Sequence, residues 1–450
     1  MTKSASQMKL GMFMREAGHH IAAWRVPEAP KHPGNNVQHM VNLAQTAERG
    51  LFDMLFWADS AGLWAGDKSE LSRICRTAWI EPFTMLAGLS MVTNHIGLTF
   101  TMTSTYTEPF NVARHFMSLD VMSGGRAAWN LVTSANQAEA QNFSREGHMA
   151  KSDRYRRARE YTDVVLRLWR SWDDDAFVED KEEGLFFDPE KLHVLNHEGD
   201  HFKVAGPLNV PRSPQGHPVM IQAGASDDGR DLAAATAEVV FVATPTIEEA
   251  RAYYKDVRER AAGYGRDPDS LKIMPGAGIM VGETDAEAEE KFDRLQKLIH
   301  PQVGVRQLSN YVAYDLSEFD VDGPLPPIPT NEISNSRVEL LVEMAKRDNM
   351  TIRQLYEAIS GSRGHMTLRG SPKTICDTLE EWFTTGAADG FNILFPTLPG
   401  SLNDFIELVI PELQRRGLFL TEYEGTTLRE NLGLPKPPDQ SALRATSAAE

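Results

Sequence analysis

The feature that most constrains the fold of this chain is a repeated alternation of short apolar runs with helical patterns. The apolar runs cover residues 9–14, 52–58, 96–103, 126–133, 219–224, 239–244, 273–281 and 390–395. They are apolar throughout, as is typical of parallel strands covered on both faces. Because helical patterns separate the runs, we predict an α/β protein with a (β/α)8 TIM barrel that carries insertions. A doubly wound open sheet is the alternative, weakened because no GxGxxG pattern follows the first run.

Length and composition are compatible with a single barrel domain. The chain has 450 residues, of which 41% are hydrophobic and 24% are charged, which is enough for a large core. We assign residues 9–433 to the barrel. We predict insertions at about 173–214 and 300–370. In the second, residues 300–335 are expected to be irregular, and short helices are expected near 338–345 and 352–360. We expect both chain ends, 1–8 and 434–450, to be flexible.

Charge and cysteine content argue against several classes of protein. The formal net charge of -17 disfavours binding to nucleic acid or to an anionic membrane, although a local pocket can still be basic. Cys75 and Cys376 have no metal-ligand spacing, which indicates reduced thiols in a cytoplasmic protein. No apolar stretch reaches the roughly 20 residues of a membrane span. His19, His20 and Asp59 form only a weak metal constellation, so we predict no metal site.

Side chains that follow the strands are candidates for the active site, because barrel enzymes react at the carboxyl ends of their strands. The candidates are Arg15, His19, His20, Asp59, Ser60, Ser104, Thr105, Tyr106, Ser134, Asn136, Gln137, Ala225, Ser226 and Thr244. Most are hydroxyls and amides, and they include no recognisable nucleophile–base pair. Such a site favours an organic cofactor that carries the chemistry itself.

One of these segments, 222–230, is suited to a phosphate. It follows the apolar residues 218–221 and contains Gly224, Ser226 and then a helical pattern. A helix that starts in this way presents unpaired backbone N–H groups and the positive end of its dipole. The alternative is an ordinary strand-to-helix turn in which Ser226 is only the N-cap.

Six motifs occur in an order that resembles a known family. They are Phe52-Asp53 with Phe56-Trp57-Ala58-Asp59; residues 103–106; residues 129–134 with Asn142-Phe143; residues 153–155 with Glu160-Tyr161; residues 222–226 with Gly229; and residues 388–392. The chain resembles the bacterial-luciferase-like flavin monooxygenases. Within them it is most similar to the nitrilotriacetate monooxygenase component A group, which also holds EDTA, dibenzothiophene-sulfone and long-chain alkane monooxygenases. The similarity covers about residues 10–432.

The resemblance implies that the barrel binds FMN. The reduced FMN would come from a separate NAD(P)H:flavin reductase, through a transient encounter or by diffusion, and O2 would be the co-substrate. Asp59 and Thr105 would lie near the flavin ring, and Ser134 near the ring or the ribityl chain. Tyr155 and Ser226 would hold the phosphate. Relatives are often dimers or tetramers, so we expect a homo-oligomer.

The chain departs from its relatives at two positions of this site. Where many relatives have a histidine four residues before Tyr155, this chain has Lys151, which would share a helix face with Tyr155 and give the phosphate a permanent positive charge. Ala135 replaces a histidine found in some relatives, so no role of that histidine is transferred. The backbone N–H groups of Ala225 and Ser226 would complete the phosphate site.

Two histidines and three pocket residues are assigned to chemistry and to the substrate. His20 or His365 could hydrogen-bond the reacting oxygen or the substrate; the alternative for each is a structural loop histidine. Phe56 and Trp64 favour an apolar or aromatic substrate, whereas Arg15 favours an anionic one. We predict a two-component monooxygenase that oxygenates a small organic substrate next to a C–N or C–S bond. The alternatives are deazaflavin-dependent hydride transfer and a non-catalytic flavin-binding protein.

Overall fold

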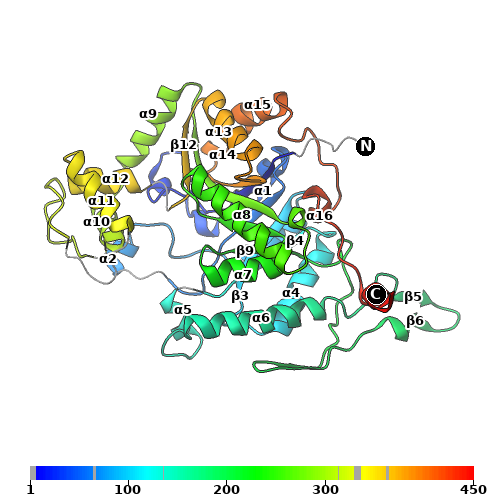
Figure 1. The fold of residues 1–450 in the computed structure, drawn as a ribbon. Coiled ribbons are helices and arrows are strands. Elements are labelled where there is room, and N and C mark those ends of the chain that lie inside the picture. The colour runs from blue at the N-terminus through cyan, green and yellow to red at the C-terminus, as the bar shows by residue number, and fades with distance from the viewer. Residues whose placement is uncertain are drawn as a thin grey trace.

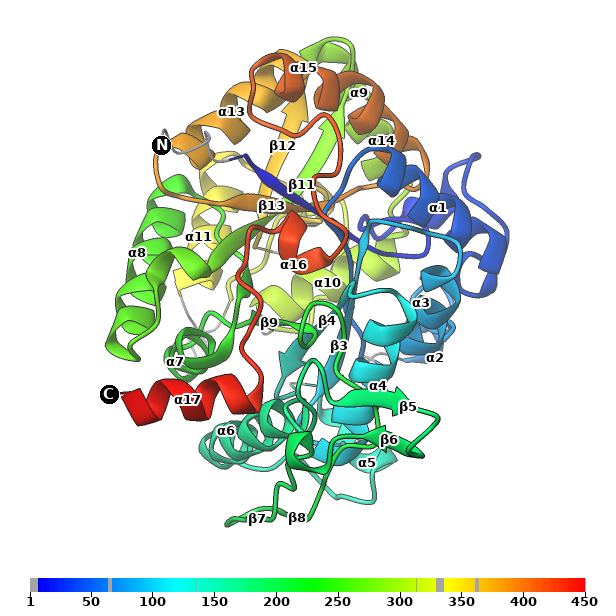
Figure 2. The same cartoon turned by 90° about the vertical axis from the view of Figure 1, so that its right-hand side faces the viewer.

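The computed structural model describes residues 7–63, 67–134, 136–312, 314–328, 336–360 and 364–449, and its centre is a closed parallel barrel (Figures 1 and 2). The barrel strands are β1 (Lys9–Phe13), β2 (Met54–Trp57), β3 (Gly97–Thr103), β4 (Ala127–Val132), β9 (Val219–Ala223), β10 (Val239–Val242), β11 (Lys272–Val281) and β13 (Gly390–Leu394). They pair in this order, and the β1–β13 ladder closes the ring. The predicted (β/α)8 barrel is confirmed.

Helices cover the outside of the barrel (Figure 2). They are α1 (Val37–Arg49), α3 (Pro82–Ser90), α4 (Pro109–Met122), α6 (Lys151–Leu168), α7 (Asp227–Thr236), α8 (Ile247–Gly263), α9 (Asp285–Gln296) and α13 (Pro372–Thr384), followed by α14 (Gly400–Asp404), a π-helical turn (Phe405–Val409) and α15 (Ile410–Arg415). Ser226, Thr246 and Ser371 each cap a helix through a side-chain oxygen that accepts a backbone N–H bond. These caps fix where the helices begin after the strand-end loops.

The first predicted insertion contains two short hairpins. Strands β5 (Phe177–Asp180) and β6 (Leu185–Phe187) form one, and β7 (His197–Glu198) and β8 (Lys203–Val204) form the other. The β5–β6 hairpin protrudes from the barrel in both views (Figures 1 and 2).

The second insertion is more regular than the sequence indicated. Residues 300–335 were expected to be irregular, yet α10 (Pro301–Val312) lies there. The two short helices expected near 338–345 and 352–360 are present as α11 (Ser336–Arg347) and α12 (Ile352–Ile359). Strand β12 (Met366–Gly370) was also missed, and it pairs in parallel with the second half of β11. These helices share their own hydrophobic cluster, which includes Leu308 and Leu355, and this explains how the insertion folds beside the barrel.

Three shorter helices lie between these elements or after them: α2 (Lys68–Leu71), α5 (Gln137–Asn142) and α16 (Leu428–Asn431). Helix α16 closes the amino end of the barrel, where Leu428 packs with Val219 and Val239 from the first residues of their strands. The buried Arg429 pairs with Glu238 there.

The C-terminal segment, expected to be flexible, forms a helix, α17 (Gln440–Ala449). It is attached to the first insertion, because the Ser441 hydroxyl donates to the carboxylate of Asp173 and Arg212 donates to the carbonyl of Pro437. Among the described helices, none has both the length and the apolarity that crossing a membrane requires.

Candidate active site

A cavity of about 480 Å³ lies at the carboxyl ends of β2, β3, β4 and β9. Its volume falls in the range of small-molecule sites, roughly 300–1,000 Å³. Among the predicted residues, six line it: Phe56, Asp59, Ser60, Ser134, Asn136 and Tyr155. The lining also includes Thr101, Thr103, Asn130, Glu139 and Gln222, none of which was assigned a role from the sequence. The cavity therefore joins side chains from separate motifs into one site.

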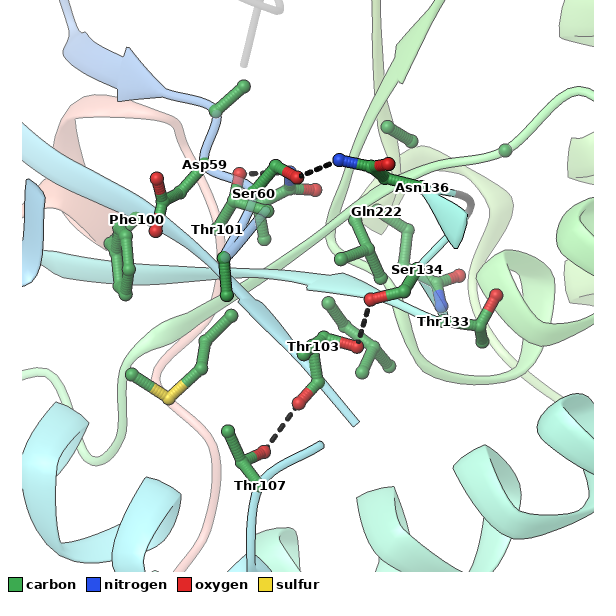
Figure 3. A pocket seen from close by; sticks show the side chains of 18 of the residues that line it. Asp59, Ser60, Phe100, Thr101, Thr103, Thr107, Thr133, Ser134, Asn136 and Gln222 are labelled. Carbon is green, nitrogen blue, oxygen red and sulfur yellow. Dashed lines mark hydrogen bonds between the residues drawn. The ribbon is translucent and has the colours of Figure 1, made fainter. Parts of the chain in front are cut away.

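Hydroxyl groups from two strands form one side of the cavity (Figure 3). The Ser134 hydroxyl donates to Thr103 Oγ1 over 2.8 Å. Ser134 has a φ of 57°, a left-handed conformation that is uncommon outside glycine and that turns the chain sharply as it leaves β4. The Thr105 hydroxyl is different: it donates to the carbonyl of Thr133 over 2.8 Å, and Thr105 does not line the cavity.

Two buried amide side chains in the cavity lining each have a carbonyl oxygen without a hydrogen-bond partner. Asn130 donates to Thr101 Oγ1 over 2.7 Å, but its own Oδ1 accepts no hydrogen bond. Gln222 is 5% exposed, and its Oε1 is likewise unpaired. A buried polar atom without a partner costs about 1–3 kcal/mol, so both oxygens are suited to accept hydrogen bonds from a ligand.

Acidic and amide groups form another edge of the cavity. The Ser60 hydroxyl donates to Glu139 Oε1 over 2.8 Å, and Asn136 Nδ2 donates to the Ser60 oxygen over 3.0 Å (Figure 3). Glu139 Oε2 is buried and unpaired. Burial raises the pKa of Asp59, and the nearby carboxylates Glu81 and Glu139 act in the same direction, whereas a hydrogen bond from Trp79 opposes them.

The segment 222–230 adopts the predicted strand, turn and capped helix. Ser226 is the N-cap of α7, and its Oγ accepts from the backbone N–H of Gly229 over 3.3 Å. The Tyr155 hydroxyl lies 3.4 Å from the same oxygen. A Cβ on Gly229 would come within 3.2 Å of the Tyr155 hydroxyl, so glycine allows α6 and the start of α7 to approach closely. Ala225 precedes the cap and does not line the cavity.

Lys151 is the first residue of α6, so it shares a helix face with Tyr155 as expected. Its ammonium lies 5.9 Å from the centre of the Tyr155 ring. Its side chain is 54% exposed, and its Nζ is 3.5 Å from Asp228 Oδ2 at the start of α7. The lysine therefore stands beside the capped turn and shares its charge with an aspartate.

Three phenylalanines, Phe13, Phe56 and Phe241, form an aromatic wall of the cavity. Their ring centroids lie 5.1–5.5 Å apart. His365 stacks on Phe241 with the ring centroids 5.2 Å apart. Burial lowers the pKa of His365 to about 4, so its ring is neutral at pH 7, and its Nδ1 is unpaired. His365 therefore borders the cavity across Phe241.

The other predicted catalytic histidine occupies a different place. His20 does not line the cavity, and both of its ring nitrogens have partners: Nε2 lies 2.8 Å from Gln296 Oε1, and Nδ1 accepts from the N–H of Ala22. Burial lowers its pKa to about 4. These contacts favour the structural alternative for His20, whereas His365 keeps a buried Nδ1 without a partner, packed against Gly276.

The predicted substrate residues are only partly brought together. Phe56 is buried in the aromatic wall, and the guanidinium carbon of Arg15 lies 5.8 Å from the ring centre of Phe13 on that wall. Trp64 lies outside the described residues. Within the described residues, no group of three or more His, Cys, Asp or Glu side chains is arranged to hold a metal.

The side chains without an assigned role carry a signal in the sequence. Thr99, Thr101 and Thr103 alternate with apolar residues along β3, and Asn130 interrupts the apolar run of β4. A period of two places alternate residues on one face of a strand. Polar residues at such positions inside a buried parallel strand point to the barrel interior, and this pattern would have identified them.

The barrel, with a cavity of hydroxyl, amide, acidic and aromatic side chains at its carboxyl end, defines an enzyme of the TIM-barrel class. Comparison with known proteins makes the class specific. Residues 17–388 match the family model described as luciferase-like monooxygenase. This chain belongs to the luciferase-like monooxygenase family, and it is a monooxygenase.

Named relatives cover nearly the whole chain. It is 49% identical to nitrilotriacetate monooxygenase component A of Aminobacter aminovorans over 445 residues, which are 97% of this chain and 98% of that protein. It is 50% identical to N-acetyl-S-(2-succino)cysteine monooxygenase of Bacillus subtilis (strain 168) over 446 residues, 98% of this chain and 100% of the relative. The crystal structure of riboflavin lyase with modified FMN and riboflavin superposes with a TM-score of 0.83 at 29% identity, covering 97% of this chain and 98% of that one.

Proposed function

We propose that this chain is the oxygenating component of a two-component monooxygenase that uses reduced FMN and O2. The observation that carries the proposal is the juxtaposition of two unpaired buried amide oxygens, on Asn130 and Gln222, with the capped turn of α7 at the other part of the same cavity. FMN needs both features: hydrogen-bonding groups along the polar edge of its isoalloxazine ring, and a site for its phosphate.

The residues present are compatible with FMN. Asn130 Oδ1 and Gln222 Oε1 can accept hydrogen bonds from a ring N–H, and Ser134 and Thr103 can bind the hydroxyls of the ribityl chain. Tyr155, Ser226 and the first N–H groups of α7 would hold the phosphate, with Lys151 adding positive charge beside them. When bound, reduced FMN supplies the two electrons that let O2 deliver one oxygen atom to the substrate and the other to water.

The chain's own residues would then position the reactants and exclude water. The aromatic wall of Phe13, Phe56 and Phe241 offers an apolar surface beside the cavity, and His365 lies against it as a neutral ring that can accept or donate one hydrogen bond. An apolar wall limits the access of water, which would otherwise divert the reaction to hydrogen peroxide.

The substrate in this proposal is a small organic molecule oxygenated next to a C–N or C–S bond. The names of the two relatives near 50% identity support it, because nitrilotriacetate contains C–N bonds and N-acetyl-S-(2-succino)cysteine contains a C–S bond. Hydroxylation of the carbon beside the heteroatom gives a product that cleaves to a carbonyl compound and an amine or a thiol.

The reduced cofactor would come from a separate flavin reductase. One relative is named nitrilotriacetate monooxygenase component A, and this name supports a division of the reaction between two proteins. A cavity open to diffusing FMN makes a transient encounter sufficient. Self-association of the chain stays a prediction.

The test is reconstitution of the full chain with FMN, a flavin reductase and NADH. We expect NADH-dependent oxygen consumption that rises when a substrate with a suitable C–N or C–S bond is added, together with cleavage of that bond. Turnover without FMN, or anaerobic hydride transfer with a deazaflavin, would contradict the proposal. FMN binding without any oxygenation of a substrate panel would favour the non-catalytic alternative.

A further inference from the structure

Two guanidinium groups, Arg15 and Arg76, lie beyond the aromatic wall of the cavity. Arg15 follows β1 and approaches the Phe13 ring. Arg76 comes from the segment before α3 and donates to the backbone carbonyl of His19, whose ring packs edge-on against Phe13 with the centroids 4.5 Å apart. Both arginines are therefore attached to the loop that Phe13 begins.

Neither guanidinium forms an ion pair within the described part of the chain. Both side chains are only partly exposed. Burial and the charge of Arg15 lower the pKa of Arg76 to about 10, while Cys75 and Glu16 oppose that shift. The Glu16 carboxylate lies near enough to act on Arg76, but the two form no salt bridge. In a protein with a formal net charge of -17, two close cations without a paired anion are an exception that needs a cause.

Polar atoms around the two arginines are also unpaired. Arg15 Nε and His19 Nδ1 are buried and have no hydrogen-bond partner, and the same is true of His365 Nδ1. His19 is only 8% exposed. Burial and the charges of Arg15 and Arg76 hold the pKa of His19 well below its usual range, so its ring is neutral. Because His19 Nε2 donates to the carbonyl of Phe13, the unpaired Nδ1 of this neutral ring is an acceptor, and Arg15 Nε is the unused donor of the cluster.

We propose that Arg15 and Arg76 form a subsite for a carboxylate group of the substrate, bordering the cavity across the Phe13 ring. The inference rests on the proposed function, and it gives the substrate class as an organic acid. A carboxylate is the anion that fits best, because guanidinium forks bind its two oxygens side by side and charge-assisted hydrogen bonds satisfy donors such as Arg15 Nε.

Such a subsite determines specificity through orientation. A carboxylate held beyond Phe13 leaves the rest of the molecule to lie along the aromatic wall and into the cavity. A neutral analogue of the same shape would leave both cations without an anion, so the site would reject it. Arg15 and Arg76 therefore act as binding residues that fix which carbon reaches the cofactor.

The test measures binding of carboxylic acids and of their methyl esters to the purified full chain, with and without FMN. The probes are tricarballylate, iminodiacetate and succinate, titrated by calorimetry. We expect at least one acid to bind the wild type and its ester to bind at least about tenfold more weakly. Arg15→Gln and Arg76→Gln should each weaken binding of that acid about tenfold or more, while Arg15→Lys and Arg76→Lys retain part of the affinity.

Three controls separate this inference from folding and from the proposed function. Arg114→Gln changes an exposed arginine on α4 and should leave acid binding unchanged. Thermal melting shows whether each variant is folded. FMN binding, measured by flavin fluorescence, should be the same in the arginine variants as in the wild type; loss of FMN binding in the wild type would contradict the proposed function but not the subsite. Equal binding of acid and ester, no binding of any acid, or glutamine variants that bind the acid as well as the wild type would overturn the inference.

Discussion

At the residue scale, two hydroxyl groups, those of Tyr155 and Ser226, lie where a phosphate would bind. The Tyr155 hydroxyl and the Ser226 Oγ converge at the start of α7, but they play unequal parts in the fold. Ser226 caps the helix, whereas the Tyr155 hydroxyl has no other hydrogen-bond partner among the described residues. Substituting each residue can therefore separate helix capping from the proposed binding of the phosphate.

We predict that Tyr155→Phe weakens FMN binding about fivefold without lowering the melting temperature, because it removes one hydrogen bond of roughly 1 kcal/mol that the fold does not need. Ser226→Ala should weaken FMN binding and also destabilise the protein by about 1 kcal/mol, since it removes the cap. Fluorescence titration of FMN and thermal melting measure the two effects. Tyr264→Phe, at the C-cap of α8, removes a hydroxyl that donates to Asp231 outside the cavity lining; it is the control and should leave FMN affinity unchanged. Unchanged FMN affinity in Tyr155→Phe would contradict the assignment.

Gly276 lets His365 reach the aromatic wall. A Cβ at this position would lie 2.3 Å from His365 Nδ1 and 2.9 Å from the Phe241 ring. Gly276→Ala should destabilise the protein by about 1–3 kcal/mol, since His365 or the backbone has to move. Gly88→Ala, in α3, has open space around the new methyl group and should stabilise by about 0.5–1 kcal/mol. Urea unfolding compares the two variants; a neutral Gly276→Ala would show that His365 is free to turn away.

The same glycine shows what sequence reasoning could and could not supply. Gly276 and Gly278 interrupt the apolar run 273–281 in the sequence, yet β11 is continuous through both. The sequence pattern located the strand correctly, because its apolar residues are local information. The reason for the glycine is the ring of His365, 89 residues further on, and no local pattern contains that contact.

At the scale of elements, sequence and structure agree closely at α1, because residues 37–49 have helical apolar spacing, Gly50 follows them, and the observed helix has the same bounds. Apolar spacing and a terminating glycine are sufficient there. Strand β12 was missed because its residues, Met366–Gly370, alternate between buried and exposed rather than forming an apolar run. It pairs only with β11, on the outer part of that strand, so it needs one buried face and not two.

Asp120 links three elements and gives the molecule a pH dependence. The α4 carboxylate accepts from the N–H of Ala127 on β4 and from Ser213 and Gln215 in the loop before β9. Burial raises its pKa from 3.8 to about 7, and these hydrogen bonds oppose the shift. Because the folded-state pKa is the higher one, the folded protein keeps a proton that the unfolded chain releases between about pH 4 and 7. The contribution of Asp120 to stability is therefore present at low pH and lost as the pH rises.

We predict that the free energy of unfolding of the wild type, relative to Asp120→Asn, falls by up to about 1.4 kcal/mol per pH unit in that window. Urea unfolding of both proteins at pH 4.5, 5.5 and 6.5 measures the difference. Using the difference removes the other buried carboxyls, such as Asp53, which titrate equally in both proteins. Parallel pH profiles would show that Asp120 is ionised throughout.

At the scale of the whole molecule, the second insertion contacts the segment that follows β2 at the carboxyl end of the barrel. Arg306 on α10 pairs with Glu70 on α2 over 3.4 Å, and Gln302 donates to Ser69 over 2.7 Å. Figure 1 shows α10 and α2 side by side. These contacts join the segment after β2 to the insertion that contains His365. They therefore stabilise the position of the insertion beside the aromatic wall.

We predict that the double variant Gln302→Ala/Arg306→Ala raises the fraction of consumed oxygen released as hydrogen peroxide, about twofold or more, because a loosened insertion admits water to the site. Peroxide formed per NADH oxidised, in the presence of substrate, is the measurement. Arg353→Ala breaks an ion pair inside the insertion, with Asp322, and should leave that ratio unchanged. An equal rise in both variants would indicate general destabilisation instead.

The aromatic wall has a consequence for how such a protein changes over generations. On one side of Phe13, Phe56 and Phe241 lie the groups from β3, β4, α6 and α7 that fit a cofactor; on the other lie Arg15 and His365, from the loop after β1 and from the end of the second insertion. Mutations behind the wall can alter which molecules are accepted while the cofactor site is inherited intact. Descendants of one such protein can thus acquire different substrates while they keep the same cofactor site.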